Sequence, residues 1–411
     1  MTEVRELGTG ENEPVPLLEP RDGTPDPVDS LDGLADVVER FAAGSGPVAL
    51  DAERASGYRY SQRAYLVQLR RTGAGTALID PIACPDLSEL DAAIGDTEWV
   101  LHAASQDLPC LAELGMRPRR LFDTELAGRL AGFDRVGLGA MVSGLLGYAL
   151  EKGHSAADWS TRPLPKPWLT YAALDVEVLV ELRDRLETIL DEQDKLDWAR
   201  QEFAAIAAAD PPPPRADPWR RTSGIHRVRT RRQLAYIREL WTARDEMARR
   251  RDIAPGRVLP DSAIVTAALQ PPANPQELLA LPVFGGRSTR RHLRTWFAAI
   301  DRARRLPDSA LPERASGDGP PPHHRWAERD PAAAARLAAA RAAVTALAES
   351  HTLPVENLLA PDLVRRLCWQ PPDPVTAAAV HDFLVTSGAR PWQVELTAEL
   401  LADALRNVDV T

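Results

Sequence analysis

The feature that most constrains the fold is the stretch Pro47–Glu53, where a short apolar run ends abruptly in two carboxylates. Residues 48–50 predict a buried strand. In a strand, side chains two residues apart share a face, so Asp51 and Glu53 point the same way. Two like charges ~4 Å apart repel by roughly 4 kcal/mol at an effective dielectric near 20, and a divalent cation between them reverses that sign. Alone, Asp-x-Glu is also typical of a surface loop after a strand.

Apolar spacing places this strand in an α/β domain. Strand patterns at 48–50, 65–69 and 77–79 are joined by short turns, which predicts an antiparallel meander. The other expected elements are helices at 31–41, 86–94, 123–130 and 138–146, a strand at 99–101, a helix from Ser105, a loop at 153–167 and strongly helical residues 168–209. We therefore predict a mixed sheet with helices packed on it.

Two Pro-rich segments divide the rest of the chain. The predicted units are a disordered acidic tail (1–30), the α/β domain (31–209), a linker (210–218), a basic helical domain (219–306), a second linker (307–328) and a second helical domain (329–411). Residues 251–261 and 351–362 share a pattern of a Pro turn, an apolar pair and Pro-Asp. A period of roughly 100 residues is typical of two small domains rather than a solenoid.

Charge is distributed unevenly along the chain, whose formal net charge is −10. Residues 1–210 carry 20 Lys and Arg against 37 Asp and Glu, whereas residues 211–305 carry 20 against 8. The overall charge argues weakly against a nucleic-acid partner. A basic middle segment beside an acidic first domain instead indicates a polyanion-binding module joined to a cation-binding one. Because nearly all the positive charge is Arg, codon bias is an alternative explanation for it.

Two further motifs supply candidate site residues. Asp107 follows the strand at 99–101 near the first turn of a helix, where an acidic residue commonly offsets the helix dipole. Tyr171 and Asp175 lie at i and i+4 on a helix, so they share a face about 6 Å apart along its axis. An isolated Tyr-x-x-x-Asp is more often a half-exposed tyrosine beside a solvated aspartate. The order of all the motifs along the chain is more specific than any one of them.

Taken together, the motifs resemble the DEDDy group of 3′–5′ exonucleases, which have a ribonuclease H-like fold, and within it the ribonuclease D family. The matching segments are Asp51-Ala-Glu, Tyr65-Leu-Val-Gln-Leu, His102-Ala-Ala-Ser-Gln-Asp-Leu, Leu121-Phe-Asp-Thr-Glu, Asp158-Trp-Ser-Thr-Arg-Pro-Leu and Leu169-Thr-Tyr-Ala-Ala-Leu-Asp-Val. The two helical domains resemble HRDC domains, the helicase-and-RNase-D C-terminal module. One departure is Arg54, where the family usually has an apolar aromatic residue.

The resemblance implies a metal-dependent 3′–5′ exoribonuclease that releases 5′-mononucleotides from tRNA precursors or other structured RNA 3′ ends. The implied ligands of two divalent ions, Mg²⁺ or Mn²⁺, are Asp51, Glu53, Asp107 and Asp175. Two ions ~3.5–4 Å apart clamp an in-line phosphoryl displacement, and Tyr171 would position the attacking water. The alternatives are a DNA exonuclease of the same fold and a catalytically inactive RNA-binding protein. The intact acids and tyrosine argue against the inactive protein.

Seven further residues are candidate RNA contacts: Gln68, His102, Lys152, Trp159, Arg162, Arg287 and Arg290. Each has an ordinary structural alternative. His102 ends a strand and Gln68 lies within one, so both could be purely structural. Trp159 and Arg162 could anchor their loop against the core, and Lys152 could be a solvated lysine.

The remaining features concern the environment of the protein. Three scattered cysteines, Cys84, Cys110 and Cys368, indicate neither a disulfide framework nor a zinc site. No apolar run approaches membrane-spanning length, and the first residues lack a signal-peptide pattern. We expect a cytoplasmic monomer that binds RNA and no membrane.

Overall fold

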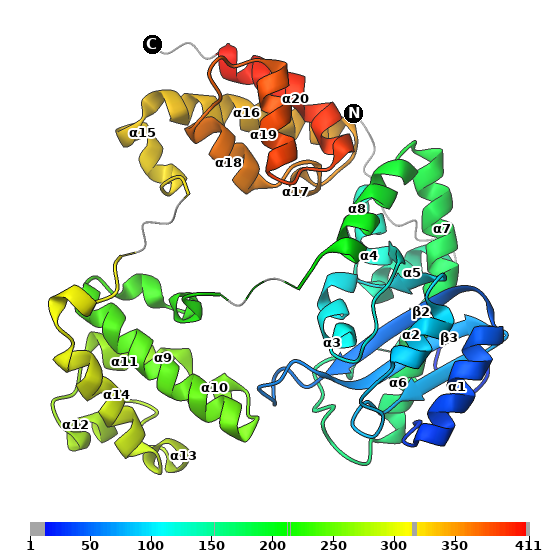
Figure 1. Cartoon of the computed structure of the whole chain (residues 1–411), viewed down its shortest axis with the longest axis horizontal. Coiled ribbons are helices and arrows are strands. Elements are labelled where there is room, and N and C mark those ends of the chain that lie inside the picture. The colour runs from blue at the N-terminus through cyan, green and yellow to red at the C-terminus, as the bar shows by residue number, and fades with distance from the viewer. Residues whose placement is uncertain (1–12, 152, 212, 214, 315–318, 408–411) are drawn as a thin grey trace.

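The computed structural model describes residues 13–151, 153–211, 213, 215–314 and 319–407. Its elements gather in three lobes, as Figure 1 shows. Among the described residues, the first lobe holds every strand together with helices α1–α8, and the second and third lobes are helical. This arrangement confirms the predicted fold class, an α/β sheet domain followed by two helical domains.

A five-stranded mixed sheet organises the first lobe, in the order β4-β3-β2-β5-β6. Its strands are β2 (Ser45–Arg54), β3 (Ala64–Thr72), β4 (Gly75–Ile79), β5 (Glu98–Leu101) and β6 (Arg120–Asp123). Short turns make β2, β3 and β4 antiparallel neighbours, as predicted. Helical crossovers make β2, β5 and β6 parallel. The central strand is therefore β2, and its carboxyl end carries the Asp-x-Glu motif.

Helices cover this sheet and bring distant residues to the end of β2. They are α1 (Leu31–Ala43), α2 (Ser88–Ile94), the 3-10 turn η1 (Ala104–Gln106), α3 (Leu108–Ala112), α4 (Thr124–Leu130), α5 (Leu138–Leu146), α6 (Lys166–Glu177), α7 (Leu179–Glu192) and α8 (Leu196–Ala208). Helix α6 packs across β2, β3 and β4, and α7 packs against β2 and β5. The crossing of α6 over β2 carries the Tyr-x-x-x-Asp motif to the Asp-x-Glu motif.

The structure corrects part of the prediction that residues 1–30 form a disordered tail. Residues 1–12 lie outside the described residues, but from residue 13 onward the chain follows the first lobe. Strand β1 (Val15–Leu17) pairs in parallel with β7 (Tyr148–Leu150). The Thr24 hydroxyl lies 2.9 Å from that of Thr170 on α6. The prediction of disorder is wrong for residues 13–30, because backbone pairing and side-chain contacts compensate for their few apolar groups.

The structure adds detail to the prediction at strand β6 and in the helical region 168–209. Strand β6 was missed because it is short and begins with a charged residue, Arg120. The strongly helical residues 168–209 fall in three helices, α6, α7 and α8. The chain breaks at Val178, and again near Asp194, whose φ of 56° lies in the left-handed region. The breaks let α7 and α8 fold back onto α4, and the predicted loop at 153–167 contains no helix or strand before α6.

The second and third lobes repeat one helical order about 100 residues apart, as the sequence pattern indicated. The second lobe contains η2 (Pro218–Arg221), η3 (Ile225–Arg227), α9 (Arg231–Arg251), α10 (Pro255–Val258), α11 (Asp261–Leu269), α12 (Pro275–Ala280), α13 (Arg287–Arg290), α14 (Leu293–Arg305) and η4 (Asp308–Ala310). The third contains η5 (His323–Arg325), α15 (Trp326–Arg329), α16 (Pro331–Ser350), α17 (Val355–Leu358), α18 (Pro361–Trp369), α19 (Ala377–Thr386) and α20 (Pro391–Arg406). Trp326 is fully buried, so the third lobe begins inside the expected second linker.

Specific contacts join the first lobe to each of the others. The loop after β2 meets the end of α9, where the Asp252 carboxylate accepts hydrogen bonds from the backbone N–H groups of Tyr60 (3.1 Å) and Ser61 (2.9 Å). On the other side, the Trp392 ring of α20 stacks on Trp198 of α8 with centroids 4.9 Å apart. No helix in the described part of the chain has both the length and the apolar composition that crossing a membrane requires.

Replacing Asp252 with Gly should loosen the contact between the first two lobes. Glycine tolerates the left-handed backbone at this position (φ 46°) but removes both charge-assisted hydrogen bonds. We expect trypsin to cleave at Arg59 or Arg63 about tenfold faster, since hydrogen bonds to charged groups contribute roughly 1.5–3 kcal/mol. Time-resolved digestion followed by mass spectrometry measures this rate.

The matched control is Glu246→Ala, an exposed acidic residue on the same helix α9. Its digestion rate should equal that of the wild type. The rate for Asp252→Asn should lie between those of the wild type and Asp252→Gly. Equal rates for wild type and Asp252→Gly would contradict the assigned contact.

Candidate active site

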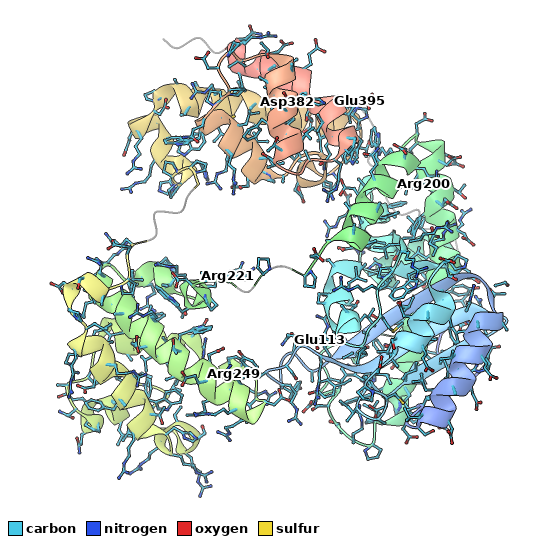
Figure 2. The ribbon with its side chains drawn as sticks, viewed as in Figure 1. Glu113, Arg200, Arg221, Arg249, Asp382 and Glu395 are labelled. Atoms are coloured by element: carbon cyan, nitrogen blue, oxygen red, sulfur yellow. The ribbon has the colours of Figure 1, made fainter. Side chains whose placement is uncertain are left out.

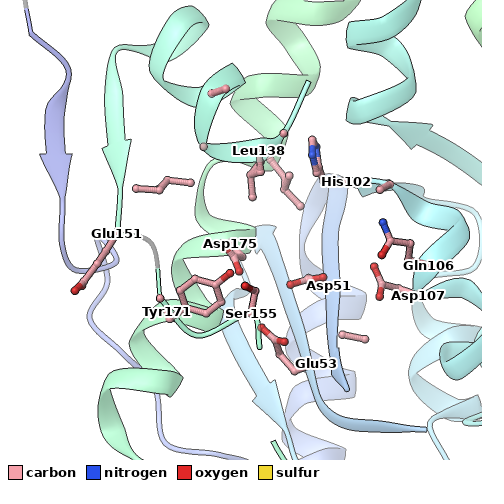
Figure 3. Close-up of a pocket in the computed structure, with 18 of the residues that line it drawn as sticks. Asp51, Glu53, His102, Gln106, Asp107, Leu138, Glu151, Ser155, Tyr171 and Asp175 are labelled. Atoms are coloured by element: carbon pink, nitrogen blue, oxygen red, sulfur yellow. The ribbon is translucent and has the colours of Figure 1, made fainter. Parts of the chain in front are cut away.

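The five predicted catalytic residues line one cavity of about 720 Å³. The carboxyl end of β2 supplies Asp51 and Glu53, and one turn of α6 supplies Tyr171 and Asp175. Asp107 stands at the N-terminus of α3, and its side chain makes no capping hydrogen bond. Figure 3 shows these side chains around a common space, with Asp51 between Asp175 on one side and Asp107 on the other.

Three of the carboxylates form a tight group. One oxygen each from Asp51, Glu53 and Asp175 lies within 4.8 Å of the others. Asp107 stands apart from this group and pairs with Arg54, whose Nη2 lies 3.3 Å from its Oδ1. A donor set made only of carboxylate oxygens suits hard cations such as Mg²⁺ and Mn²⁺.

Burial raises the pKa values of all four acids, and the charge of Asp51 raises those of the other three further. Burial, followed by the charges of Asp51 and Asp175, raises the pKa of Glu53 to about 10. Burial and the charge of Asp51 raise the pKa of Asp107 to about 8. Burial also raises the pKa values of Asp51 and Asp175 above the ordinary range. A cation bound among these carboxylates would offset that repulsion, so the residues present fit a metal centre.

Aromatic neighbours hold Tyr171 beside the acids. His154 packs edge-on against its ring at 5.7 Å between centroids, and Trp159 lies 6.5 Å away. The Tyr171 hydroxyl donates a hydrogen bond to Asp175. Burial and the negative charges of Asp175 and Glu53 raise the pKa of Tyr171 above its ordinary value. The hydroxyl therefore keeps its proton at neutral pH.

Comparison with known proteins places this geometry in a family. Ribonuclease D of Gluconacetobacter diazotrophicus is 34% identical over 313 residues, covering 73% of this chain and 78% of the relative. Ribonuclease D of Escherichia coli is 33% identical over 299 residues, covering 69% of this chain and 76% of the relative. The chain belongs to the ribonuclease D family. It is thus a 3′–5′ exonuclease by descent, and a family model described as 3′-5′ exonuclease matches residues 25–191.

The helical lobes of this ribonuclease D-family protein also match known domains. The HRDC domain model matches residues 233–300. A model described as a 3′ to 5′ exonuclease C-terminal domain matches residues 319–405, the lobe for which we predicted an HRDC-like domain.

Two solved structures span nearly the whole chain. A protein from Bifidobacterium adolescentis is 40% identical with a TM-score of 0.88, covering 96% of this chain and 100% of that one. Escherichia coli RNase D, described as an exoribonuclease involved in structured RNA processing, is 28% identical with a TM-score of 0.66, covering 93% and 98%.

Three of the candidate RNA contacts, Gln68, Trp159 and Arg162, make structural contacts within the first lobe. Gln68 is fully buried, and its Nε2 donates to Asp51 Oδ2 at 3.2 Å. Trp159 is fully buried as well, with its ring N–H bonded to a backbone carbonyl. Arg162 pairs with both carboxylate oxygens of Asp80 at 2.7 and 2.8 Å and donates to the Tyr65 carbonyl. The predictions that Gln68 and Trp159 contact RNA are wrong, because both side chains are fully buried. The Arg162 side chain is 31% exposed, so its contact with RNA stays a prediction.

The other four candidates have different surroundings. His102 lines the cavity, but its Nδ1 lies 2.9 Å from the Thr124 hydroxyl, and burial lowers its pKa to about 4. Its ring is therefore neutral, and its contact with RNA stays a prediction. Lys152 lies outside the described residues. Arg287 and Arg290 are exposed on α13, so their role in RNA binding stays a prediction.

Sequence reasoning missed the residue that orients Asp107. The Asp123 carboxylate accepts hydrogen bonds from the N–H groups of Ala103 (3.0 Å) and Ala104 (2.9 Å). These bonds hold a turn in which Ala103 has a φ of 60° and which leads directly into Asp107. The signal was available, since Asp123 precedes Thr-Glu in the manner of a helix N-cap and lies in one of the matching segments.

The raised pKa values predict how the stability of metal-free protein depends on pH. Asp107 and Glu53 bind protons more tightly when folded than when unfolded, where carboxyl pKa values are near 4. The free energy of unfolding therefore falls as pH rises from about 4 toward the folded pKa values of about 8 for Asp107 and about 10 for Glu53. In EDTA the melting temperature should fall between about pH 5 and about pH 9, and added Mn²⁺ should reverse the fall.

Differential scanning fluorimetry of Asp175→Asn provides the comparison. This variant should show a shallower pH slope in EDTA and a smaller gain from Mn²⁺, whereas Asp36→Asn, at an exposed position on α1, should match the wild type. A melting temperature that rises with pH in EDTA, or an unchanged response in Asp175→Asn, would contradict the assigned electrostatics.

Proposed function

We propose that this protein is a metal-dependent 3′–5′ exoribonuclease that releases 5′-mononucleotides from RNA 3′ ends. The observation that carries the proposal is the shared cavity, into which β2, α3 and α6 bring four carboxylates and one tyrosine hydroxyl. Buried like charges are unfavourable unless a cation or a proton neutralises them. Membership of the ribonuclease D family supports this reading.

Each group in the cavity has a proposed role. Asp51, Glu53 and Asp175, with Asp107 opposite, would hold two divalent ions, Mg²⁺ or Mn²⁺. Such ions supply a nucleophile at neutral pH and stabilise the charge that develops on the phosphate and the leaving oxygen. Tyr171 keeps its proton at neutral pH, so it would orient the attacking water through a hydrogen bond rather than act as a base.

The proposed substrate is RNA, with tRNA precursors or other structured RNA 3′ ends as the natural class. Its support is the described activity of the Escherichia coli relative, together with the basic second lobe. Figure 2 shows Arg221 and Arg249 on the part of this lobe turned toward the first lobe, and both are exposed. Exposed arginines suit phosphate contacts whose strength falls with salt.

Two secondary proposals complete this reading. We propose a cytoplasmic location, for which the support is three buried, unpaired cysteines, Cys84, Cys110 and Cys368. We also propose that the protein acts as a monomer, since each acid and the tyrosine come from one chain.

Digestion of RNA and DNA strands of the same sequence tests the main alternative, a DNA exonuclease of the same fold. Preferential release of nucleotides from the RNA supports the proposal, and preference for DNA would favour the alternative. A scaffold protein without activity would release nothing from either strand in Mg²⁺ or Mn²⁺.

Replacing Asp51 with Asn should lower kcat for mononucleotide release at least 10³-fold. The amide keeps the shape and the hydrogen bond with Gln68 but removes a negative charge from the centre of the acidic cluster. The measurement follows 5′-labelled RNA on denaturing gels with Mn²⁺. As a control, Asp36→Asn should retain wild-type kcat. Persistent digestion by Asp51→Asn would refute the assigned site.

Replacing Tyr171 with Phe should have a narrower effect. The ring keeps its packing against His154 and Trp159 but loses the hydroxyl that would orient water. We expect kcat to fall about 10²-fold, the contribution typical of one positioned proton-transfer or hydrogen-bonding group. Mn²⁺ affinity, measured by isothermal titration calorimetry, should stay within about twofold of the wild type. Unchanged kcat would show that the hydroxyl takes no part in the reaction.

A further inference from the structure

Arg54 occupies an unusual position for a cation. It is the last residue of β2, directly after Glu53, and lines the same cavity as the acids. Its side chain is 25% exposed and pairs with Asp107, whose side chain is only 8% exposed. The charge of Arg54 also acts on Asp51 and Glu53, lowering their pKa values against the raising effect of burial. Arg54 is thus the internal counterion of the metal-free cluster.

The pairing divides the acids into two groups. Asp51, Glu53 and Asp175 approach one another closely, and among the described residues the Arg54 guanidinium forms an ion pair with none of these three carboxylates. Asp107 lies outside that group, and Arg54 is the partner of its carboxylate. A second cation that used Asp107 would meet a guanidinium already in place there. The first cation would meet no such competitor at the three-acid group.

The contact between Arg54 and Asp107 is weakly held. It consists of one ion pair through Nη2 at 3.3 Å, and no other hydrogen bond of the Arg54 guanidinium occurs among the described residues. Arg162 gives the contrast within the same lobe, because its Nε, Nη1 and Nη2 all donate, at 2.7 to 2.9 Å. An arginine that permanently braces the fold has the bonding of Arg162. The single contact of Arg54 is suited to exchange.

A second, smaller cavity adjoins the main one at Arg54. A space of about 190 Å³ shares Ala52, Glu53 and Arg54 with the main cavity and continues between residues 56–57 and residues 155–157. The guanidinium therefore stands where the two spaces join. Its planar fork matches the oxygens of a phosphodiester, which it can bind in a bidentate manner.

We propose that Arg54 is an exchangeable counterion, which pairs with Asp107 in metal-free protein and with a phosphate of the RNA once a cation occupies Asp107. This inference rests on the proposed function and extends it to a residue that recognises substrate. The exchange would couple loading of the second cation to RNA binding, since the same event that fills Asp107 releases the guanidinium. Charge also balances, because two divalent ions neutralise four carboxylates and Arg54 neutralises the added phosphodiester.

Mn²⁺ titration of RNA-free protein by calorimetry tests the first half of the exchange. Arg54→Ala should tighten the weaker Mn²⁺ site roughly 2- to 5-fold, the range that a partly exposed ion pair contributes. The tighter site should change less, because Arg54 acts on Asp51 and Glu53 through its charge and pairs directly with Asp107. Arg54→Lys keeps the charge and should stay near the wild type. Arg119→Ala, which removes one exposed arginine that pairs with Asp96, is the matched control and should change neither site. Weaker Mn²⁺ binding by Arg54→Ala would instead show a permanent brace for Asp107 and overturn the proposal.

Binding of a 5′-labelled oligoribonucleotide, with Ca²⁺ replacing Mn²⁺ to prevent turnover, tests the second half. Arg54→Ala should weaken RNA binding about 10-fold in Ca²⁺ but have little effect in EDTA, where the guanidinium is engaged with Asp107. Arg54→Lys should recover part of the affinity. Equal RNA affinities of Arg54→Ala and wild type in Ca²⁺ would overturn the proposal.

These outcomes are separable from failure of the proposed function. If Asp51→Asn still digested RNA, the catalytic assignment would fail whatever the Arg54 variants showed. If Asp51→Asn were inactive while Arg54→Ala changed neither Mn²⁺ nor RNA binding, the exonuclease assignment would stand and the exchange alone would be wrong.

Discussion

Repulsion among four carboxyl groups, of which Glu53 and Asp107 are buried and Asp51 and Asp175 partly buried, is the constraint on which the rest of this structure depends. Asp51 lies at their centre, between Asp175 and Asp107, and its charge raises the pKa of each neighbour. A protein can tolerate such a cluster only if protons, an arginine or bound cations offset the charge. The cluster thus lowers the stability of the metal-free fold and favours the binding of divalent cations. The same carboxylates therefore affect both the stability of the fold and the proposed catalysis.

The surrounding fold keeps the unfavourable cluster in place. Buried Gln68 fixes Asp51 from the neighbouring strand, and Asp123 holds the turn that presents Asp107. The loop that leads into α6 is tied to the sheet by the bonds of Arg162 to Asp80 and by the buried Trp159. The acids are consequently positioned by hydrogen bonds and packing from the strands and loops around the cavity.

The sequence predicted much of this architecture because its main features are local. Alternation of side chains along β2 placed Asp51 and Glu53 on one face of the strand. Helical spacing placed Tyr171 and Asp175 on one face of a helix. Their meeting depends on α6 crossing β2, which no local pattern encodes, and family resemblance supplied it. Gln68 was misjudged because a polar residue in a motif suggests substrate contact, whereas only the fold reveals that its side chain is fully buried against Asp51. The fold likewise reveals that Arg162 anchors its loop through Asp80 and the Tyr65 carbonyl. The catalytic roles themselves stay predictions.

The most direct test of this account is a crystal structure of the protein grown with Mn²⁺, using anomalous scattering to locate the ions. The account predicts two Mn²⁺ peaks about 3.5–4 Å apart, with Asp51 contacting both and Asp107 contacting one. Peaks elsewhere on the molecule, or a single ion that leaves Asp107 paired with Arg54 in saturating Mn²⁺, would contradict the two-ion centre.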